Sequence, residues 1–563
     1  MQLNGSEMVM HALKNEGVKV VFGYPGGAAL NLYDEIYKQD FFEHILTRHE
    51  QAAVHAADGY ARASGEVGVA IVTSGPGFTN TITGIATAYM DSIPLVIISG
   101  QVPTSLIGTD AFQEIDAVGI SRPCTKHNYL VKNIEELPKI LKEAFYIARS
   151  GRPGPVHIDL PKDISATIGE FNYPDEIKLQ TYKPTYHGNL RQIKKAAQAI
   201  KESKKPLLYI GGGAIASKST KIIKEICEVT QIPAVETLMA RGILPHNHPN
   251  LLGMVGMHGS YCANMAMSEA DLIIALGARF DDRVTGKLSE FAKYAQIIHI
   301  DIDPSSISKI VNANYPIVGD IKNVLEELLP LLRDECDFKS ILSWREQLGR
   351  YSKLHPLSYQ DSTVPLKPQW ILQKLGEILG DSAIISTDVG QHQMWAAQFY
   401  PFSHPRQFIT SGGLGTMGFG LPAAMGAKKA FPNKTSINIS GDGSILMNIQ
   451  ELMTCFVYGI PVINIILNNN YLGMVRQWQT FFYENRYSET DLEKQPDFVK
   501  LVESFGGYGK ICHSKEEFVS ALQEAIDSNR PSLLDVRIDR MENVLPMVPT
   551  GGALFNMILE HKE

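Results

Sequence analysis

The pattern that most constrains the fold of this chain is a recurring alternation of short apolar runs and helical stretches. The runs are rich in valine and isoleucine, and several are followed within two residues by glycine, as in residues 67–73, 206–210 and 435–440. Apolar runs of this kind, separated by helices, are typical of parallel strands that are buried on both faces of a sheet. The sequence therefore predicts an α/β protein built from doubly wound parallel sheets.

The length and two linkers divide the chain into three. A chain of 563 residues has room for three or four domains. Residues 172–187 contain prolines and few aliphatic side chains, and a second proline-containing stretch covers about 351–368, so both suit linkers. We expect three domains over residues 1–172, 188–345 and 366–563, of which the outer two look alike in kind.

The composition excludes several classes of protein. Hydrophobic residues make up 44% of the chain and the formal net charge is −8, whereas disordered chains are less apolar and nucleic-acid binders are basic. No apolar run approaches the ~20 residues that a membrane span needs, and the start lacks the pattern of a signal peptide. The six cysteines show no metal-ligand spacing, so we expect reduced, mostly buried thiols in a cytoplasmic protein.

The strongest chemical signal is a polar pair at the ends of two predicted strands in the third domain. Asp442 follows strand 435–440 between two glycines, and Asn469 follows the next strand, 461–467. Oxygen ligands of these types suit a hard divalent cation that also takes oxygens from a diphosphate, and glycines let backbone N–H groups approach phosphate. Taken singly, the aspartate could stabilise a turn and the asparagines a polar loop.

The run Gly441-Asp442-Gly443, followed at this distance by two asparagines, resembles the signature of thiamine-diphosphate enzymes. The resemblance implies that Asp442, Asn469 and the backbone carbonyl of Tyr471 hold Mg²⁺ against the cofactor diphosphate. It also implies a catalytic glutamate on another domain, which hydrogen-bonds the aminopyrimidine ring of the cofactor. Glu50 is the candidate, because it follows a predicted strand and opens a helix; by itself it could simply compensate the helix dipole.

Other segments match family positions that contact thiamine diphosphate. Met417 corresponds to the bulky side chain that bends the cofactor, although its glycine-rich surroundings could alone be a flexible turn. His392 matches the segment that touches the diphosphate, and alone it could be a surface histidine. The remaining implied contacts are Gly75, Asn80, Val389, Gly390, Gln391, Gly415, Gly441, Gly443, Ser444, Gly473 and Met474.

The middle domain favours one branch of this family. Residues 253–259, 277–286 and 300–303 closely resemble the large catalytic subunits of acetohydroxyacid synthase, also called acetolactate synthase, of the FAD-containing biosynthetic kind. This resemblance implies a Rossmann-like FAD domain, although the three glycines at 211–213 alone are weak evidence for a dinucleotide.

The implied FAD contacts are Arg152, Gly211, Gly212, Gly213, Thr237, Leu238, Met257, His258, Gly259, Gly277, Ala278, Arg279, Asp281, Arg283, Asp301, Ile302 and Asp320. Without the resemblance, Arg152 could be an ordinary surface charge. Asp301 and Asp320 could likewise be simple helix caps.

The substrate residues come from the same resemblance. Residues 101–114 are nearly a fingerprint of the family and imply a substrate channel lined by Gln113 and Lys162. Arg283 would hold the carboxylate of the second 2-oxoacid, a task suited to a bidentate guanidinium, and Trp478 would pack against its alkyl group. On their own, they could be a surface arginine and a core tryptophan.

The resemblance covers about residues 5–556 and implies a reaction. Pyruvate would add to thiamine diphosphate and lose CO₂, and the hydroxyethyl carbanion would attack pyruvate or 2-oxobutyrate. The products, 2-acetolactate and 2-aceto-2-hydroxybutyrate, begin branched-chain amino-acid synthesis. FAD would be structural, because carboligation has no net redox change. Two departures from the family, Asn470-Tyr471 and Thr550, should leave the chemistry intact.

Three other functions stay open. A pyruvate oxidase shares the domains and cofactors but would turn over FAD. A non-catalytic binding subunit would be expected to lose Glu50, Asp442 or Asn469, all of which are present. A dinucleotide dehydrogenase rests only on weak glycine patterns.

The expected partners follow from the similar outer domains and from the family. Two similar domains and a divided site suggest a homodimer with active sites between subunits, as in the family. Valine feedback would need a separate regulatory small subunit. We expect small 2-oxoacids as substrates, and neither nucleic acid nor a membrane as a partner.

Overall fold

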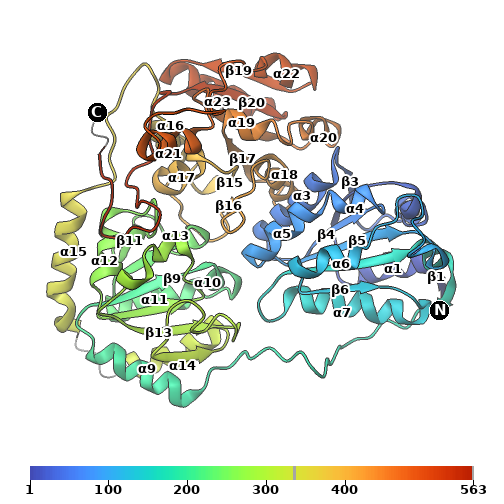
Figure 1. Ribbon diagram of the computed structural model, residues 1–563, viewed down its shortest axis with the longest axis horizontal. Coiled ribbons are helices and arrows are strands. Elements are labelled where there is room, and N and C mark those ends of the chain that lie inside the picture. The colour runs from blue at the N-terminus through green and yellow to red at the C-terminus, as the bar shows by residue number, and fades with distance from the viewer. Residues whose placement is uncertain (334–337, 561–563) are drawn as a thin grey trace.

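Three six-stranded parallel sheets, each flanked by helices, form three adjoining lobes (Figure 1). The computed structural model describes residues 1–333 and 338–560. The first lobe, drawn in blue, lies beside the other two, with the green middle lobe below the orange and red third lobe. The predicted fold class, doubly wound α/β with three parallel sheets, is confirmed.

The first sheet has the strand order β3-β2-β4-β5-β7-β6. Its strands are β2 (Val20–Tyr24), β3 (Glu43–Leu46), β4 (Gly68–Val72), β5 (Leu95–Gln101), β6 (His127–Leu130) and β7 (Pro155–Pro161). Its helices are α1 (Gly5–Asn15), α2 (Leu30–Lys38), α3 (Glu50–Ser64), α4 (Pro76–Thr79), α5 (Ile82–Asp91), α6 (Ala117–Ser121), α7 (Leu137–Arg149) and α8 (Lys162–Ala166). The central strands β4 and β5 are buried along their whole length, which explains their unbroken apolar sequences. A two-stranded antiparallel ribbon joins β1 (Gln2–Asn4) to β8 (Ile168–Glu170).

The third sheet repeats that order as β16-β15-β17-β18-β20-β19. Its strands are β15 (Ala383–Thr387), β16 (Phe408–Thr410), β17 (Thr435–Ser440), β18 (Val462–Asn468), β19 (Tyr508–Cys512) and β20 (Ser532–Arg537). Its helices are α16 (Pro368–Leu379), α17 (Gln391–Phe399), α18 (Gly420–Ala430), α19 (Asp442–Ile445), α20 (Glu451–Val457), α21 (Gly473–Phe482), α22 (Phe498–Ser504) and α23 (Lys515–Ser528). In chain order, both outer sheets place their second strand at one edge and their fifth at the other.

The middle sheet is built differently, in the order β11-β10-β9-β12-β13-β14. Its strands are β9 (Pro206–Ile210), β10 (Ala234–Glu236), β11 (Leu251–Met254), β12 (Leu272–Leu276), β13 (Gln296–Asp301) and β14 (Tyr315–Val318). Its helices are α9 (Leu190–Glu202), α10 (Gly212–Ala216), α11 (Thr220–Thr230), α12 (Tyr261–Glu269), α13 (Asp282–Thr285), α14 (Ile321–Arg333) and α15 (Leu342–Leu354). The direction in which strands are added reverses between β9 and β12, and ligands of open α/β sheets bind at such a switch point.

Helices α3 and α18 pack against each other and join the two outer lobes. Gly59 of α3 lies against Ala423, and Gly426 of α18 lies against Ala56, so the two helices run antiparallel. A Cβ atom on Gly59 would lie only 2.5 Å from Ala423 Cα. The absence of side chains at both glycines therefore allows the backbones to approach closely, and helices of both lobes share one apolar core.

Two further predictions concern membrane-spanning helices and the state of the cysteines. No helix within residues 1–333 and 338–560 is long and apolar enough to cross a membrane. Four of the five described cysteines are buried, Cys124 is half-buried, and all five are free thiols. Cys336, the sixth, lies outside the described residues.

Candidate functional site

Asp442 and Asn469 lie at the carboxyl ends of β17 and β18, which are neighbours in the third sheet. Both side chains are buried, at 1% and 4% exposure. Burial raises the pKa of Asp442 to about 7, and the Gln495 amide donates a hydrogen bond to its Oδ2. No ion pair joins Asp442 to a lysine or arginine among the described residues. A buried carboxylate without a cationic side chain in contact suits a bound divalent cation.

The backbone after Asn469 turns back on itself. Asn470 adopts a left-handed φ of 57°, and the Tyr471 N–H donates to Asn469 Oδ1 at 3.2 Å. This turn keeps residue 471 beside the asparagine side chain. The geometry suits the predicted role of the Tyr471 carbonyl as a third oxygen ligand, alongside Asp442 and Asn469.

Glycines and helix starts form a cradle beside this pair. A Cβ atom on Gly441 would lie 2.9 Å from His392 Nδ1, and one on Gly473 would lie 2.8 Å from Asn469 Nδ2. Helix α17 begins at Gln391, whose Oε1 accepts a hydrogen bond from Asn469 at 3.1 Å. Helix N-termini with glycines in close approach are suited to phosphate groups.

His392 carries an unused polar atom in this cradle. Its Nε2 is buried and has no hydrogen-bond partner within the part of the chain that the structure describes. Burial lowers the pKa of His392 to about 3, so the ring is neutral at physiological pH. The hydroxyl of Ser444 accepts the Gly441 N–H at 3.1 Å, which holds the Gly441–Ser444 turn in shape. The predicted contacts Gly390 and Gly443 lie in the same two turns.

The Met417 segment, residues 411–418, connects β16 to α18. Met417 is half-buried, and Gly415 is exposed beside Val389, whose Cγ1 would lie 3.9 Å from a Cβ there. The Thr416 N–H donates to Ser411 Oγ at 3.0 Å and closes the segment into a loop. Met474 is half-buried and packs against the core of the third lobe.

Glu50 is the first residue of α3, at the carboxyl edge of the first sheet. Asn80 donates from Nδ2 to Glu50 Oε2 at 3.0 Å, while Oε1 faces Gly77, where a Cβ would lie 3.4 Å away. Gly75 has a left-handed φ of 55° and packs on the backbone of Gln113, which also has a positive φ of 59°. Glu50, Gly75, Asn80 and Gln113 therefore lie together, as expected for one half of a site.

The predicted substrate residue Lys162 follows β7, the neighbour in the sheet of β5, after which Gln113 comes. It begins α8, directly after β7, and its carbonyl accepts a hydrogen bond from Asn31 at 3.3 Å. Asp163, the next residue, accepts the Thr104 N–H at 3.0 Å and so ties α8 to the 101–114 segment.

The structure does not bring Glu50 and the Met417 segment together within one chain. Arg62 lies over the Phe419 ring at 5.2 Å, so the end of α3 meets the start of α18. Glu50 is 62 − 50 = 12 residues before Arg62, which corresponds to roughly 18 Å along the helix. The two halves of the predicted site thus lie at opposite ends of this helix pair.

The predicted flavin glycines meet at the switch point of the middle sheet. Gly211 follows β9 and Gly277 follows β12, and a Cβ on Gly211 would lie 2.7 Å from Ala278 Cα. Gly213 is equally close to Gly277, which has a left-handed φ of 61°. Gly212 is the first residue of α10 in the same turn.

A buried hydroxyl group without a hydrogen-bond partner among the described residues borders this crevice. Thr237 follows β10, and its Oγ1 is buried with no hydrogen-bond partner among the described residues. Leu238 follows in the same turn. A crevice bordered by glycines and by an unused hydroxyl fits a dinucleotide, so the observations agree with an FAD site here.

Arg152 and Asp301, two predicted flavin contacts, are linked through Asp303. Arg152 donates to Ser92 Oγ at 2.8 Å and pairs with Asp303 at 3.2 Å. Asp301 ends β13 and accepts the Asp303 N–H at 2.9 Å; burial raises its pKa to about 6. Ile302 lies half-buried between the two aspartates.

Asp320 behaves as the helix-cap alternative describes. It accepts the Asn323 N–H at 3.2 Å at the start of α14. This cap uses Oδ1 alone, so the flavin contact of Asp320 stays a prediction.

Arg283 lies in the short helix α13, which touches residues 256–259. The Met257 N–H donates to the Arg283 carbonyl at 2.7 Å, and the guanidinium reaches Met257 Sδ at 3.7 Å. The Arg283 side chain is 56% exposed, so it can still meet a substrate. Asp281 caps this turn by accepting the Arg283 N–H at 3.0 Å.

His258 and Trp478 also have unused polar atoms. His258 Nε2 and Trp478 Nε1 are buried without hydrogen-bond partners in the described part of the chain. Burial lowers the pKa of His258 to about 4. The Trp478 ring is half-buried and contacts Phe482 at 5.9 Å between centroids. Gly259 lies behind His258, where a Cβ would be 2.7 Å from the Met254 carbonyl oxygen.

Three further residues lie at the site, and the sequence marks them weakly or not at all. Gln495 contacts Asp442 from a loop without glycines or a neighbouring strand, so no local signal marks it. Thr73, beside Gly77, has a buried hydroxyl without a partner among the described residues. Asp388 accepts hydrogen bonds from the Gly420 N–H at 2.8 Å and from Ser440 at 2.6 Å, and its place at a strand end is a usable signal.

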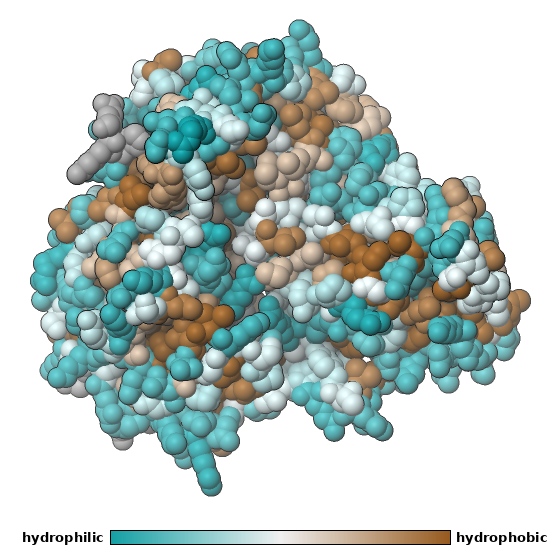
Figure 2. Space-filling view, viewed as in Figure 1, coloured by the Kyte–Doolittle hydropathy of each residue, from teal (hydrophilic) through white to brown (hydrophobic). Residues whose placement is uncertain are grey.

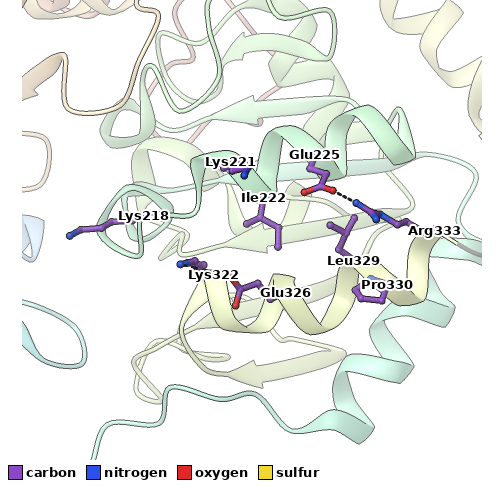
Figure 3. Close-up of a pocket in the computed structure, with 9 residues that line it drawn as sticks. All are labelled: Lys218, Lys221, Ile222, Glu225, Lys322, Glu326, Leu329, Pro330 and Arg333. Carbon is purple, nitrogen blue, oxygen red and sulfur yellow. Dashed lines mark hydrogen bonds and ion pairs between the residues drawn. The ribbon is translucent and has the colours of Figure 1, made fainter.

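A surface hollow between α11 and α14 lies outside the predicted site (Figure 3). Its rim is charged and includes the Glu225–Arg333 ion pair, with Ile222 and Leu329 between the helices. None of its lining residues is a predicted cofactor or substrate contact.

Family models for thiamine pyrophosphate enzymes match the chain in three places. The N-terminal TPP binding domain matches residues 3–120, the central domain 193–328 and the C-terminal TPP binding domain 388–536. Fold and site therefore define a thiamine pyrophosphate enzyme.

Full-length relatives narrow this class. The chain is 51% identical over 569 residues to the Escherichia coli acetolactate synthase isozyme 3 large subunit, covering 100% of this chain and 99% of the relative. It is 52% identical over 565 residues to the probable acetolactate synthase large subunit of Methanocaldococcus jannaschii, covering 99% and 95%. An acetolactate synthase of Mycobacterium bovis is 49% identical over 558 residues, covering 98% and 90%. The chain belongs to the family of acetolactate synthase large subunits, which confirms the resemblance.

Proposed function

We propose that this chain is the catalytic subunit of an acetolactate synthase. It decarboxylates pyruvate and joins the remaining two-carbon unit to pyruvate or to 2-oxobutyrate. The observation that supports this proposal is that residues suited to both halves of a thiamine site are present. Glu50 is held by Asn80 at 3.0 Å in the first lobe, and buried Asp442 and Asn469 end adjacent strands in the third.

The residues fit thiamine diphosphate and Mg²⁺. Thiamine diphosphate, when bound, supplies the electron sink for decarboxylation and carboligation. Asp442 Oδ, Asn469 Oδ1 and the Tyr471 carbonyl would hold Mg²⁺, which compensates the buried charge of Asp442. The unpartnered His392 Nε2 and the glycine turns at 390 and 441 would hold the diphosphate.

Glu50 is the proposed acid–base residue. Because Asn80 occupies Oε2, Oε1 is the oxygen that would exchange a proton with the pyrimidine ring. Thr73 and Gly77 form the wall beside it, and Met417 would support the cofactor from the third lobe. The side chain acts by moving a proton, so no covalent bond to the protein is needed.

The crevice of the middle sheet fits FAD. The turns at 211–213 and 277–279 would receive the diphosphate of the dinucleotide, and Thr237 Oγ1 and His258 Nε2 are donors or acceptors without partners in the described chain. We assign FAD a structural role, because joining two oxoacids transfers no net electrons.

The substrate assignments rest on exposure and chemistry. The Arg283 guanidinium, 56% exposed, would bind the carboxylate of the acceptor acid, and the half-buried Trp478 ring would contact its alkyl group. Gln113 and Lys162 would line the channel from the first lobe.

A homodimer would complete the site. Since Glu50 lies roughly 18 Å along α3 from Arg62, the residue that meets Phe419 at the start of α18, we infer that one chain supplies Glu50 and the other supplies Asp442. The surface beside these helices is suited to a subunit interface. Large apolar side chains of the α5 and α19–α20 region are 40–53% exposed: Tyr89, Leu446, Met447, Phe456 and Val457. Brown surface gathers over the first lobe around α5 (Figure 2).

Two further assignments are proposals. The names of the relatives include "large subunit", which supports a separate small subunit that regulates this chain. The free thiols of the five described cysteines support a reducing compartment, and we place the enzyme in the cytoplasm.

The test is an anaerobic assay with pyruvate, thiamine diphosphate, Mg²⁺ and FAD. We expect 2-acetolactate to form over many turnovers while the flavin absorption spectrum stays oxidised. Reduction of one flavin per pyruvate consumed would instead identify a pyruvate oxidase. Absence of acetolactate from a protein that binds both cofactors would refute the proposal.

A further inference from the structure

A buried cluster of three charged residues joins the first and third lobes. The Arg62 guanidinium lies between Asp58, one turn earlier on α3, and Asp91 at the end of α5. Its Nη2 is 2.9 Å from Asp91 Oδ2, and Asp58 Oδ1 contacts its Nε. The side chains of Asp58, Arg62 and Asp91 are 0%, 5% and 1% exposed.

The cluster has one more negative charge than positive, and the backbone of the third lobe satisfies the excess. The Gly412 N–H donates to Asp91 Oδ2 at 3.0 Å, and the Gly413 N–H donates to Asp91 Oδ1 at 2.7 Å. Arg62 donates from Nη1 to the Thr410 carbonyl at 2.8 Å. Both oxygens of one carboxylate therefore hold the beginning of the Met417 segment.

The same helix holds the other end of that segment. The hydroxyls of Thr87, in the middle of α5, and Thr416 are 2.7 Å apart, and both residues are buried. Thr416 immediately precedes Met417. Helix α5 thus holds residues 411–418 at two places. Asp91 contacts the beginning of the loop, and Thr87, four residues earlier on the helix, contacts its end.

The middle lobe meets the cluster at the same point. Arg279 donates from Nη1 to the Met90 carbonyl at 3.0 Å, and a Cβ on Gly413 would lie 3.0 Å from Arg279 Nη2. Residues 90 and 91 therefore contact both a proposed flavin residue, through the Met90 carbonyl, and the Met417 segment, through the Asp91 carboxylate. Met90 and Asp91, at the end of α5 in the first lobe, thus contact the middle lobe and the third lobe respectively.

We propose that Asp91 is a positioning residue for the Met417 segment. It sets where Met417 stands beside the thiamine site, and Arg62 and Asp58 hold the Asp91 carboxylate in place. The inference rests on the proposed function for the meaning of Met417. The placement of the segment by Asp91 depends only on the contacts above.

The test replaces the carboxylate while keeping its shape, with Asp91→Asn. Amide hydrogen exchange is measured in protein without added cofactors, on a peptide that spans 411–418. We expect exchange there to become roughly tenfold faster or more, because the asparagine amide has one acceptor oxygen and no charge, so one of the two hydrogen bonds is lost and the other is no longer charge-assisted. Binding of thiamine diphosphate with Mg²⁺, followed by calorimetry, should weaken by about tenfold.

The matched control is Glu16→Gln. The Glu16 carboxylate is also buried, at 2% side-chain exposure, in the same lobe, and it contacts Lys142 at 2.9 Å and Tyr173 at 2.8 Å. It lies at the end of α1, away from the Met417 segment. This variant should change exchange around α1 and α7 and leave 411–418 and cofactor binding as in the unmodified protein.

A second variant approaches the contact from the other side. Gly413→Ala places a methyl group 2.7 Å from Asp91 Oδ1 while all three charged residues of the cluster are retained. It therefore tests the contact even if Asp91→Asn does not fold. It should accelerate exchange in 411–418 in the same way. Unchanged exchange there in the variants, or acceleration spread over the whole first lobe, would overturn the inference. Acetolactate formation by the unmodified enzyme is a separate readout, whose failure would count against the proposed function alone.

Discussion

The first and third lobes have the same strand order and carry different chemistry at the same strand ends. After the second strand, the first lobe has Glu50 and the third has the Met417 segment. After the third strand, the first lobe has Gly75 and Asn80, and the third has Asp442. Under the proposed function, one scaffold presents a proton-transfer carboxylate in one copy and an oxygen site for a cation in the other, so the strand-end residues would decide the role of each lobe.

The largest expected effect tests the cation half of this comparison. Asp442→Ala removes a buried oxygen ligand, so Mg²⁺-dependent binding of thiamine diphosphate should be lost and turnover should fall by on the order of 10⁴-fold or more. Calorimetry with and without Mg²⁺ measures the binding. Undiminished affinity for the cofactor would count against the metal site.

The next effect tests the proton-transfer half. Glu50→Gln keeps the hydrogen bond from Asn80 possible and removes the titrating carboxyl group, so turnover should fall by roughly 10²–10⁴-fold. Thiamine binding and thermal unfolding should stay close to those of the unmodified enzyme. Full activity in this variant would remove Glu50 from the reaction.

Mixing the two variants sharpens the comparison. If one chain supplies Glu50 and the other Asp442, a hybrid dimer of Glu50→Gln and Asp442→Ala chains has one intact site. Random reassociation should then restore about one quarter of the normal activity, because about half of the dimers are hybrid and each has one good site of two. No recovery after verified subunit exchange would mean that each site lies within a single chain.

A smaller effect concerns the contact between the lobes. Gly426→Ala on α18 would place a methyl group 2.6 Å from the Tyr60 backbone nitrogen of α3, and overpacking of this kind costs about 1–3 kcal/mol. The control is Gly349→Ala in α15, where a Cβ meets nothing within 4 Å; it should stabilise by about 0.5–1 kcal/mol. Urea unfolding measures both, and equal stabilities of the two variants would contradict the close helix contact.

The last prediction compares two carboxylates on corresponding strands. Asp159 on β7 accepts hydrogen bonds from two neutral side chains, Ser99 at 2.7 Å and Gln101 at 2.9 Å. Asp535 on β20, in contrast, forms an ion pair with Arg537 at 2.6 Å. Burial without a cation raises the pKa of Asp159 from 3.8 to about 7. Between these values the folded state binds a proton that the unfolded state has released, so stability falls as pH rises.

The measurement is unfolding free energy from pH 4 to pH 8 in the unmodified protein and in Asp159→Asn. The unmodified protein should lose on the order of 2–4 kcal/mol relative to the variant across the window from about pH 4 to about pH 7. Parallel pH curves for the two proteins would show that Asp159 does not titrate in this way.

Much of the fold and of each half-site followed from local patterns. The apolar runs at 67–73 and 435–440 became β4 and β17, because strands buried on both faces need apolar residues throughout. Strand ends with glycine or polar residues marked Gly75, Gly211 and Asp442 in the same way. Gln495 and Asp91 gave no such signal, because each contributes through a partner far along the chain.

The sequence by itself determined the class of sheet, the residue types at the strand ends and, through its resemblance, the chemistry. Only the tertiary structure decided how these parts meet. The antiparallel contact of α3 and α18 separates Glu50 from the Met417 segment, and the Asp91 carboxylate ties that segment to α5. The physical reason is that hydrogen-bonding pattern and hydrophobic periodicity are local, whereas close helix contacts and buried charge depend on what packs opposite them.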